Sequence, residues 1–192
     1  VVLYFSGEVY AMSIADGKEL WSDSLLADKR TQAGSVFSGI GGDPVVDTDV
    51  AFTASSGGLL SALYLPNGRH VWDKPVGSLN TPWLAGDFLF VLSSDNTLIC
   101  FVKYDGRVRW ATRLRSYGNQ KEKKDPIVWR GPVLVNGNLA VVGSDGELLL
   151  ISATDGKVAA TKSVAEGIDT APVVGGGRMY LESQDATLYE LQ

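Results

Sequence analysis

One six-residue phrase occurs four times in this chain, and no other feature constrains its fold as strongly. The phrase opens with a turn glycine behind an acidic or amide residue and closes on a tryptophan four residues after the glycine. Its copies are Asp16–Trp21, Asn67–Trp72, Asp105–Trp110 and, with alanine in place of the tryptophan, Asp155–Ala160. A proline lies 28 residues before the last residue of three of these copies, at Pro44, Pro82 and Pro132. An offset kept through three copies indicates one structural unit that is used repeatedly.

The pattern inside one unit predicts four β-strands. In the copy that opens at Pro82, strands are expected over 82–85, 88–92, 97–102 and 107–110, with short turns between them. Asp-Gly and Asn-Gly turns favour β-hairpins, because a type I′ turn needs positive φ at both central residues. The second strand is apolar on both faces, which indicates a sheet covered on both sides. A small antiparallel sheet covered by copies of itself is a blade of a β-propeller, so we predict an all-β fold of four-stranded antiparallel blades.

The repeat spacing also predicts how the chain divides. We expect one propeller fragment over 1–192 with about four and a half blades. Complete blades are expected at 43–73, 81–110 and 131–160, and partial ones at 1–21 and 170–192. Propellers commonly close by completing the last blade with a strand from the other terminus, since an open edge invites aggregation. We therefore expect a natural C-terminus after the third strand of the last unit, and a truncated beginning.

Composition excludes several classes of function. The 192 residues are 45% apolar and carry a net charge of −5, which disfavours a dedicated nucleic-acid binder, because phosphate contacts call for clustered positive charge. The single cysteine, Cys100, excludes a disulfide framework within the chain. No apolar run approaches the roughly 18 residues that a membrane-spanning helix needs.

Several segments resemble known repeat proteins. The pattern Ala-x-x-x-x-(Asp/Asn)-Gly-x-x-x-Trp, at Ala11–Trp21 and Ala62–Trp72, resembles the repeat of quinoprotein-like (PQQ-type) eight-bladed propellers. The run Gly131–Leu139, followed by Ser144–Gly146, is similar to the propeller lipoproteins of the bacterial outer-membrane β-barrel assembly machinery. The basic insertion Tyr117–Lys124 resembles their alphaproteobacterial branch. The resemblance covers the whole chain.

The resemblance implies a non-enzymatic scaffold. It implies a periplasmic protein, held at the outer membrane by a lipid anchor outside these residues. Its partners would be a BamA-type barrel protein and unfolded barrel precursors, with no nucleic acid and no cofactor in the central channel. It also implies that the repeated tryptophans dock one blade onto its neighbour. Trp21, Trp72 and Trp110 share one repeat position, so we interpret them as structural residues whose truncation to alanine would cost ~3–5 kcal/mol.

A PQQ-dependent dehydrogenase is the enzymatic alternative, because it uses the same blades. Its site needs calcium held by carboxylate and amide oxygens, a carboxylate base and commonly a pair of adjacent cysteines. Cys100 stands alone, at the repeat position that holds Ala11 and Ala62 in other copies. That position favours a small buried residue, so we interpret Cys100 as a packing residue.

Three other features each resemble part of a metal, catalytic or phosphate-binding site but lack the remaining residues that such a site needs. His70 has no second histidine with which to form a metal site, and no partner for a Ser/His relay. The glycine-rich run Ser38–Gly42 lacks the helix and the lysine of a phosphate-binding loop. Asp47–Asp49 is interpreted as a turn between strands rather than as a calcium site.

Two long connections interrupt the lean repeat. The step from Trp21 to Pro44 is 23 residues and that from Trp110 to Pro132 is 22, against 10 between Trp72 and Pro82. Both connections join the last strand of one unit to the first strand of the next, so they are expected on one face. Loops on rigid scaffolds commonly carry binding.

The two connections, 22–43 and 111–131, are therefore a predicted docking surface for a partner or an anionic membrane. Residues 111–130 hold six basic and two acidic side chains, a local charge of +4. The candidate partner-binding residues are Arg113, Arg115, Tyr117, Lys121, Lys123, Lys124 and Trp129. Two alternatives stay open: the connections are solvated surface, and Trp129 covers a blade edge.

Overall fold

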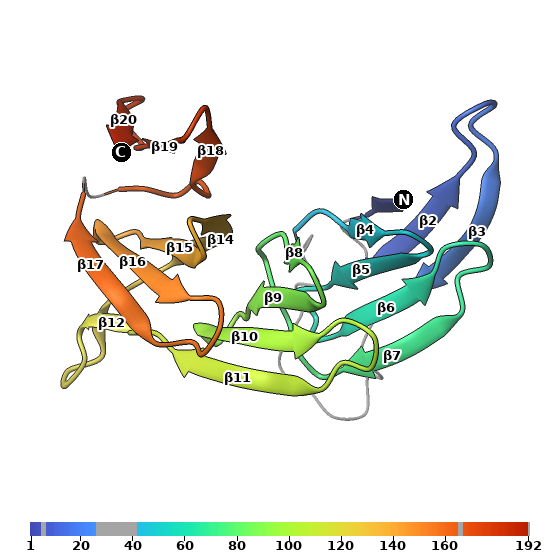
Figure 1. Ribbon diagram of the computed structural model, residues 1–192, viewed down its shortest axis with the longest axis horizontal. Helices are drawn as coiled ribbons and strands as arrows, with labels where there is room; N and C mark the ends of the chain where they lie inside the picture. Colours follow the sequence, from blue (N-terminus) through green and yellow to red (C-terminus); the bar gives the residue numbers. More distant parts are fainter. Residues whose placement is uncertain (5–6, 26–41, 165–166, 192) are drawn as a thin grey trace. The chain divides into compact units, whose positions relative to one another are not determined.

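The strands of the molecule confirm the predicted all-β class. The structure is a computed structural model that describes residues 1–4, 7–25, 42–164 and 167–191. Within the described residues all the named elements are β-strands, and strands that are neighbours in sequence pair antiparallel into small sheets (Figure 1). Three of these sheets have the predicted four-stranded meander.

The first compact unit contains residues 1–89 and 102–107. Two meanders lie wholly within it, with strand orders β1-β2-β3 and β4-β5-β6-β7. Their strands are β1 (Val2–Leu3), β2 (Glu8–Met12), β3 (Glu19–Ser24), β4 (Val45–Asp47), β5 (Val50–Ala54), β6 (Leu60–Tyr64) and β7 (His70–Lys74).

The second compact unit contains residues 90–101 and 108–192. Its sheets have the orders β14-β15-β16-β17 and β18-β19-β20, and the hairpin β12-β13 is separate from both. The sheet β8-β9-β10-β11 has residues in both units. The strands are β8 (Trp83–Ala85), β9 (Phe88–Leu92), β10 (Thr97–Val102), β11 (Val108–Arg113), β12 (Tyr117–Asn119), β13 (Lys124–Pro126), β14 (Trp129–Val135), β15 (Asn138–Gly143), β16 (Glu147–Ser152), β17 (Val158–Ser163), β18 (Val173–Gly175), β19 (Arg178–Glu182) and β20 (Leu188–Leu191).

One cross-strand pair recurs in four sheets and explains the variant copy of the phrase. The last residue of each phrase faces a residue of the preceding strand, in the pairs Ala11↔Trp21, Ala62↔Trp72, Cys100↔Trp110 and Leu150↔Ala160. Three pairs set a small side chain against a tryptophan. The fourth exchanges the sizes, and its leucine packs against the core cluster that contains Met179 and Leu181 of β19. Directly facing side chains are the units of sheet packing, and this exchange keeps one larger side chain in the pair.

Each repeated tryptophan binds the following sheet. The indole Nε1 of Trp21 donates a hydrogen bond to the carbonyl of Leu65 at 2.5 Å. Trp72 donates in the same way to Lys103 at 2.8 Å, and Trp110 to Ala153 at 3.1 Å. Every acceptor lies just after the third strand of its sheet, so one contact is repeated at three boundaries between sheets.

The glycine of the phrase provides the surface on which the preceding tryptophan rests. A Cβ added to Gly68 would lie 2.7 Å from ring atoms of Trp21, and one added to Gly156 would lie 2.5 Å from Trp110 Cε3. Both glycines also have positive φ, +72° and +73°. Glycine is therefore required here for the turn and for the close approach of the ring.

Apolar side chains from neighbouring sheets form the cores. In the first unit, Val9, Trp21 and Leu25 pack with Leu63 of the next sheet. In the second unit, a cluster from β15 and β16 packs against Ile168 and residues of β19. The second strands of the four-stranded sheets are deeply buried: Leu139, Ala140, Val141 and Val142 of β15 are 0% exposed. This burial explains why these strands are apolar on both faces.

Candidate functional site

The long connection after β11 contains a β-hairpin that the sequence pattern did not predict. β12 pairs antiparallel with β13, with Tyr117 opposite Pro126 and Asn119 opposite Lys124. The backbone N–H of Glu122 donates to the Asn119 side chain at 3.2 Å across the tip. The strands are three residues each and show no alternation of apolar and polar side chains, so hydrophobic periodicity could not reveal them.

Apolar side chains hold the base of this hairpin against the protein. Leu114 and Ile127, on either side of the hairpin, are 5% and 4% exposed, and Trp129 is 2% exposed. The Trp129 indole donates to the carbonyl of Arg115 at 2.7 Å, and the N–H of Ile127 donates to the carbonyl of Ser116 at 3.0 Å. Of the two roles weighed for Trp129, the buried ring corresponds to covering an edge, so we remove it from the docking surface.

Ion pairs occupy two of the predicted binding arginines. Arg115 Nη2 lies 2.9 Å from Asp145 and 2.8 Å from Glu147, so it fastens the hairpin base to the start of β16. The hydrogen bond with Glu147 is the main cause that raises the pKa of the Arg115 guanidinium. Arg113 pairs with Asp95 at 3.2 Å, with both side chains more than 60% exposed. Such an exposed pair contributes about 0–1 kcal/mol.

These pairs change the electrostatic picture of the insertion. The local charge of +4 over residues 111–130 meets three carboxylates from other elements, which leaves +1. The hairpin is therefore a nearly neutral projection rather than a strongly positive patch. Arg130, a further basic residue of the segment, donates through Nε to the backbone carbonyl of Asp169 at 2.6 Å.

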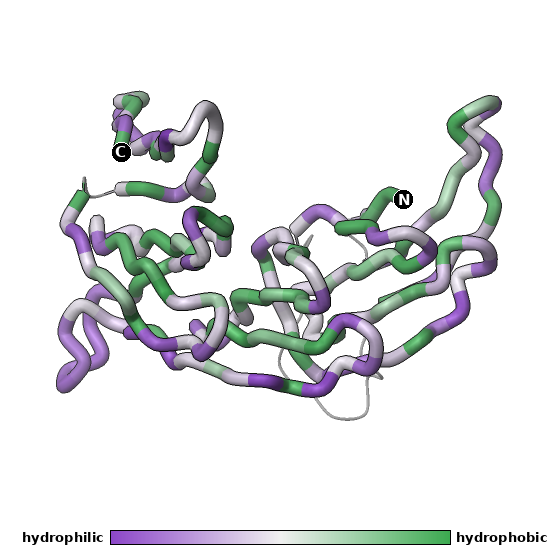
Figure 2. Tube along the Cα trace, viewed as in Figure 1, coloured by the Kyte–Doolittle hydropathy of each residue, from purple (hydrophilic) through white to green (hydrophobic). Residues whose placement is uncertain are grey.

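The lysines at the tip are the exposed candidates. Lys121, Lys123 and Lys124 are all exposed, and Tyr117 is half-buried at the start of β12. Lys124 pairs with Glu122 at 2.8 Å, whereas Lys121 and Lys123 form no ion pair with any described residue. Figure 2 shows the chain around the label β12 of Figure 1 as strongly hydrophilic. The structure thus gathers Tyr117 and the three lysines on one projecting element.

The other half of the predicted docking surface cannot be placed. Residues 26–41 of the connection 22–43 lie outside the described residues, and so does the glycine-rich run Ser38–Gly42 except for Gly42. The prediction that both long connections share one face stays a prediction.

The remaining chemical candidates have structural surroundings. Cys100 is 0% exposed, and burial raises its pKa to about 11, so its thiol is protonated near neutral pH. Asp47 forms an ion pair with Lys103 at 2.5 Å. Among the described residues, no three His, Cys, Asp or Glu side chains are arranged to hold a metal ion. Within the same ranges no helix has the length and apolar character needed to cross a membrane.

His70 contributes a contact that sequence reasoning missed. Its Nδ1 lies 2.7 Å from Asp73 on the same strand, and its Nε2 contacts Asp23 of β3 in the neighbouring sheet. Burial disfavours the charged ring, but the hydrogen bonds to Asp23 and Asp73 outweigh it and raise the pKa of His70. The pairing crosses 47 residues of sequence, so no local pattern could have signalled it.

Comparison with known proteins places the chain in a family. The profile of the family described as outer membrane protein assembly factor BamB matches residues 1–112 and 117–192. The BamB protein of Legionella pneumophila (strain Paris) is 27% identical over 192 residues, which is 100% of this chain and 47% of the relative. The chain thus spans about half the length of the curated relatives it matches.

Solved structures support the fold. The crystal structure of BamB from Moraxella catarrhalis matches with a TM-score of 0.80 at 19% identity, covering 97% of this chain and 53% of that one. A quinohemoprotein alcohol dehydrogenase from Comamonas testosteroni matches with a TM-score of 0.70 at 10% identity, over 100% of this chain and 39% of that one. Both likenesses show the propeller fold, which hosts unrelated functions. The match of the family profile shows which family the sequence fits. This chain belongs to the family of the outer membrane protein assembly factor BamB.

Proposed function

We propose that the chain is part of a non-enzymatic scaffold that assists the assembly and insertion of β-barrel proteins into the bacterial outer membrane. The observation that carries the proposal is the family match over residues 1–112 and 117–192. The scaffold acts through protein contacts on the periplasmic side of the outer membrane. Its partners are a BamA-type barrel protein and unfolded barrel precursors, and a lipid anchor outside residues 1–192 holds it in place.

The geometry supports firm packing between neighbouring sheets within each compact unit. Tryptophans at three boundaries bind the following sheet by the same hydrogen bond. Indole rings of this size stabilise a boundary by burying a large apolar area, and the N–H fixes their orientation.

We propose the hairpin Tyr117–Pro126 as one element that contacts the partner. Its base is locked by Trp129 and Arg115, while its tip lysines are exposed. A fixed base lowers the conformational entropy that binding must remove, which favours affinity. The near-neutral charge indicates that shape and hydrogen bonding contribute alongside the free ammonium groups of Lys121 and Lys123.

The role is tested in the organism that carries the gene. Deletion is expected to lower the amount of folded, heat-modifiable barrel proteins in the outer membrane, and the wild-type gene is expected to restore it. Unchanged barrel levels in the deletion strain, under conditions where the protein is normally abundant, would contradict the assembly role.

The enzymatic alternative is tested on the purified full-length protein. Cys100 is buried opposite Trp110 with a protonated thiol, an environment of packing rather than of catalysis. We expect neither the absorbance of PQQ nor stoichiometric calcium in the full-length protein purified from its own membranes. One PQQ and one calcium per molecule would support a dehydrogenase instead.

A further inference from the structure

The turn between β14 and β15 holds a chemically reactive pair, an asparagine followed by a glycine. Asn136 and Gly137 are both exposed and have positive φ, +48° and +78°. Nothing lies within 4 Å of a Cβ built on Gly137, so there is open space beside the turn. In such a pair the glycine nitrogen can attack the side-chain amide of the asparagine, because glycine has no Cβ to block the approach. The fold therefore leaves this reactive pair accessible.

The attacking nitrogen of this turn forms no hydrogen bond. Attack requires the glycine nitrogen to lose its proton and the peptide unit between the two residues to rotate. The Gly137 N–H has no hydrogen-bond partner among the described residues. The carbonyl of the same peptide unit, on Asn136, accepts one long bond from Asn138 Nδ2 at 3.4 Å. Rotation of this unit thus breaks no hydrogen bond of the N–H group.

The second asparagine–glycine pair, Asn67–Gly68, is protected by the fold. The Gly68 N–H donates to the carbonyl of Tyr64 at 2.8 Å. The Asn67 side-chain oxygen accepts from the Arg69 N–H at 3.1 Å, which fixes the amide that would react. A Cβ on Gly68 would lie 2.7 Å from ring atoms of Trp21, so the indole rests on this glycine. Rotation of the peptide unit would break the bond to Tyr64 and displace the ring.

The aspartate–glycine pairs of the chain show the same protection. The N–H of the glycine donates to a backbone carbonyl at 2.8–2.9 Å in each of these pairs, at Gly17, Gly106, Gly146 and Gly156. Among the described residues, Gly137 therefore differs from every other glycine that follows an asparagine or an aspartate. The sequence alone does not distinguish Asn136–Gly137 from Asn67–Gly68, because the difference lies in the hydrogen bonds of the folded chain.

We propose that Asn136 is a site of spontaneous deamidation in the folded protein. The Gly137 nitrogen gives its proton to solvent and bonds to Asn136 Cγ, while the side-chain nitrogen takes up a proton and leaves as ammonia. Water then opens the resulting succinimide ring at either carbonyl, which yields aspartate or isoaspartate. The reaction consumes water alone and needs no oxidant or reductant. The inference rests on the turn and does not depend on the assembly role.

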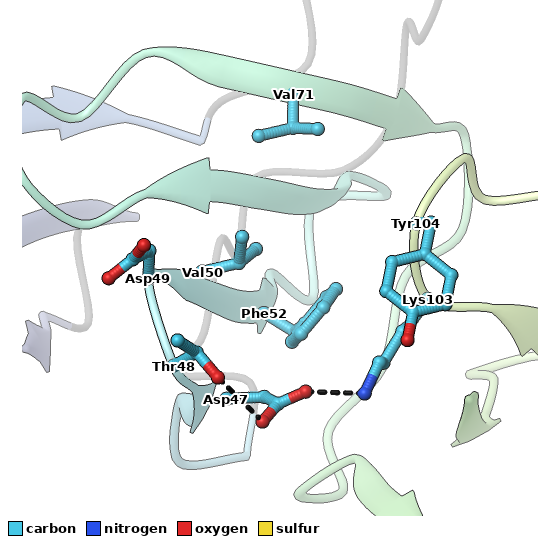
Figure 3. Close-up of a pocket in the computed structure, with 8 residues that line it drawn as sticks. All are labelled: Asp47, Thr48, Asp49, Val50, Phe52, Val71, Lys103 and Tyr104. Atoms are coloured by element: carbon cyan, nitrogen blue, oxygen red, sulfur yellow. Dashed lines mark hydrogen bonds and ion pairs between the residues drawn. The ribbon is translucent and has the colours of Figure 1, made fainter. Parts of the chain in front are cut away.

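The turn is linked to the boundary between sheets that Trp110 closes. The Gly137 carbonyl accepts from the Ala153 N–H at 3.2 Å, and the Ala153 carbonyl accepts from the Trp110 indole at 3.1 Å. The equivalent turn of the second sheet, Thr48–Asp49, accepts the same bond from Leu65 but contains no side-chain amide (Figure 3). Isoaspartate inserts an extra carbon into the main chain, so it should displace the Gly137 carbonyl and loosen the boundary at Trp110.

The test incubates the full-length protein at mildly alkaline pH and follows both asparagines by peptide mapping with mass spectrometry. In the folded protein Asn136 should convert at least about fivefold faster than Asn67, because the hydrogen bond of Gly68 must open before attack. In denaturant the two asparagines should convert at comparable rates. Comparable rates in the folded protein, or an equal preference for Asn136 in denaturant, would overturn the proposal.

Two variants separate the modification from its consequence. Asn136→Gly suits the positive φ and removes the reacting amide, so it should form no acid product at this turn. Hydrogen exchange at Ala153 should accelerate in incubated wild type and stay constant in the incubated variant. Asn67→Asp, which restores the aspartate that other copies hold, is the matched control and should behave as wild type does. Equal acceleration in wild type and Asn136→Gly, or none in fully converted wild type, would overturn the link to the boundary.

Discussion

At the scale of single residues, the glycine and the tryptophan of one phrase serve different boundaries. Trp110 rests on Gly156, which belongs to the next copy of the phrase. The two residues therefore recur together because each copy must present a ring to the following sheet and a flat turn to the preceding one. Sequence spacing could predict that both are structural, but not that they meet across copies, because that contact is made only in the folded chain.

The contact between Gly156 and Trp110 predicts that Gly156→Ala lowers the free energy of unfolding by more than the backbone strain of the turn alone. The φ of Gly156 is +73°, and a Cβ would lie 2.5 Å from the Trp110 ring. Gly137 has a similar φ of +78° with nothing within 4 Å of a Cβ, so Gly137→Ala measures the backbone strain by itself. We expect Gly137→Ala to cost ~1 kcal/mol and Gly156→Ala ~1–3 kcal/mol more, from displacement of the ring. Equal losses in chemical denaturation would contradict the docking role of Gly156.

His70 predicts a pH-dependent contribution to stability. Both ring nitrogens face carboxylates, Asp23 from β3 and Asp73 from its own strand β7, so the protonated ring, which can donate to both, is favoured. Its pKa in the fold is raised above the ordinary 6.5. The contribution is therefore fully present below pH 6.5 and is lost as the pH rises through the higher folded pKa.

The measurement is thermal unfolding of wild type and His70→Gln between about pH 5.5 and about pH 8.5. Because the ring is one-third exposed, the stability difference should be no more than about 1 kcal/mol at the acidic end and should shrink at the alkaline end. A stability difference that is constant with pH, or a His70 pKa at or below the ordinary value by NMR, would exclude stabilising ion pairs of His70 with Asp23 and Asp73.

At the scale of elements, the strands were predictable wherever burial imposed a pattern and not elsewhere. β9 is an unbroken apolar run between turns, and the sequence predicted a strand there. The hairpin β12–β13 has no such pattern, because its strands face solvent and its position depends on Trp129 and Arg115 at its base. Arg115 is a second example. The sequence showed its positive charge, but it could not show the ion pairs with Asp145 and Glu147 at the start of β16.

The anchored base predicts that Trp129→Phe loosens the hairpin. Phenylalanine keeps most of the buried ring but cannot donate to the Arg115 carbonyl, which the Trp129 indole now does at 2.7 Å. Losing this part-buried hydrogen bond should cost about 0.5–1.5 kcal/mol. Hydrogen exchange of the amides in Tyr117–Pro126 should accelerate relative to wild type. Trp83→Phe, at a half-buried tryptophan in β8, is the control and should leave exchange in the hairpin unchanged.

The exposed lysines at the tip of the hairpin Tyr117–Pro126 are expected to affect partner binding without affecting stability. Reversal of Lys121, Lys123 and Lys124 to glutamate should weaken association with the partner or with anionic liposomes, while the melting temperature changes little, because exposed charges contribute little to folding. Lys18, Lys157 and Lys162, also exposed, are reversed as the matched control with the same change in net charge. Binding is measured at low and physiological salt. Equal binding of both triple variants and wild type would assign the tip to solvated surface.

At the scale of the whole molecule, a repeated sheet with few insertions suits a protein that positions other proteins. Every four-stranded sheet of the described residues uses the same meander, and the copies depart from the repeat at individual places. The hairpin and the turn Asn136–Gly137 are two such departures. The sequence repeats predicted the sheets that all copies share, because the same packing recurs in each copy. Candidate sites lie where the copies differ, and the structure is needed to locate them.

We propose above that this chain belongs to a scaffold of outer-membrane barrel assembly. Its most direct test is affinity purification of the full-length protein from its own membranes in mild detergent, with mass spectrometry of the co-purifying proteins. We expect a BamA-type barrel protein to be recovered in near-stoichiometric amount, and its recovery to fall in the Lys121, Lys123 and Lys124 reversal. Purification of the protein free of any barrel-assembly component, under conditions that keep the machinery intact, would contradict it.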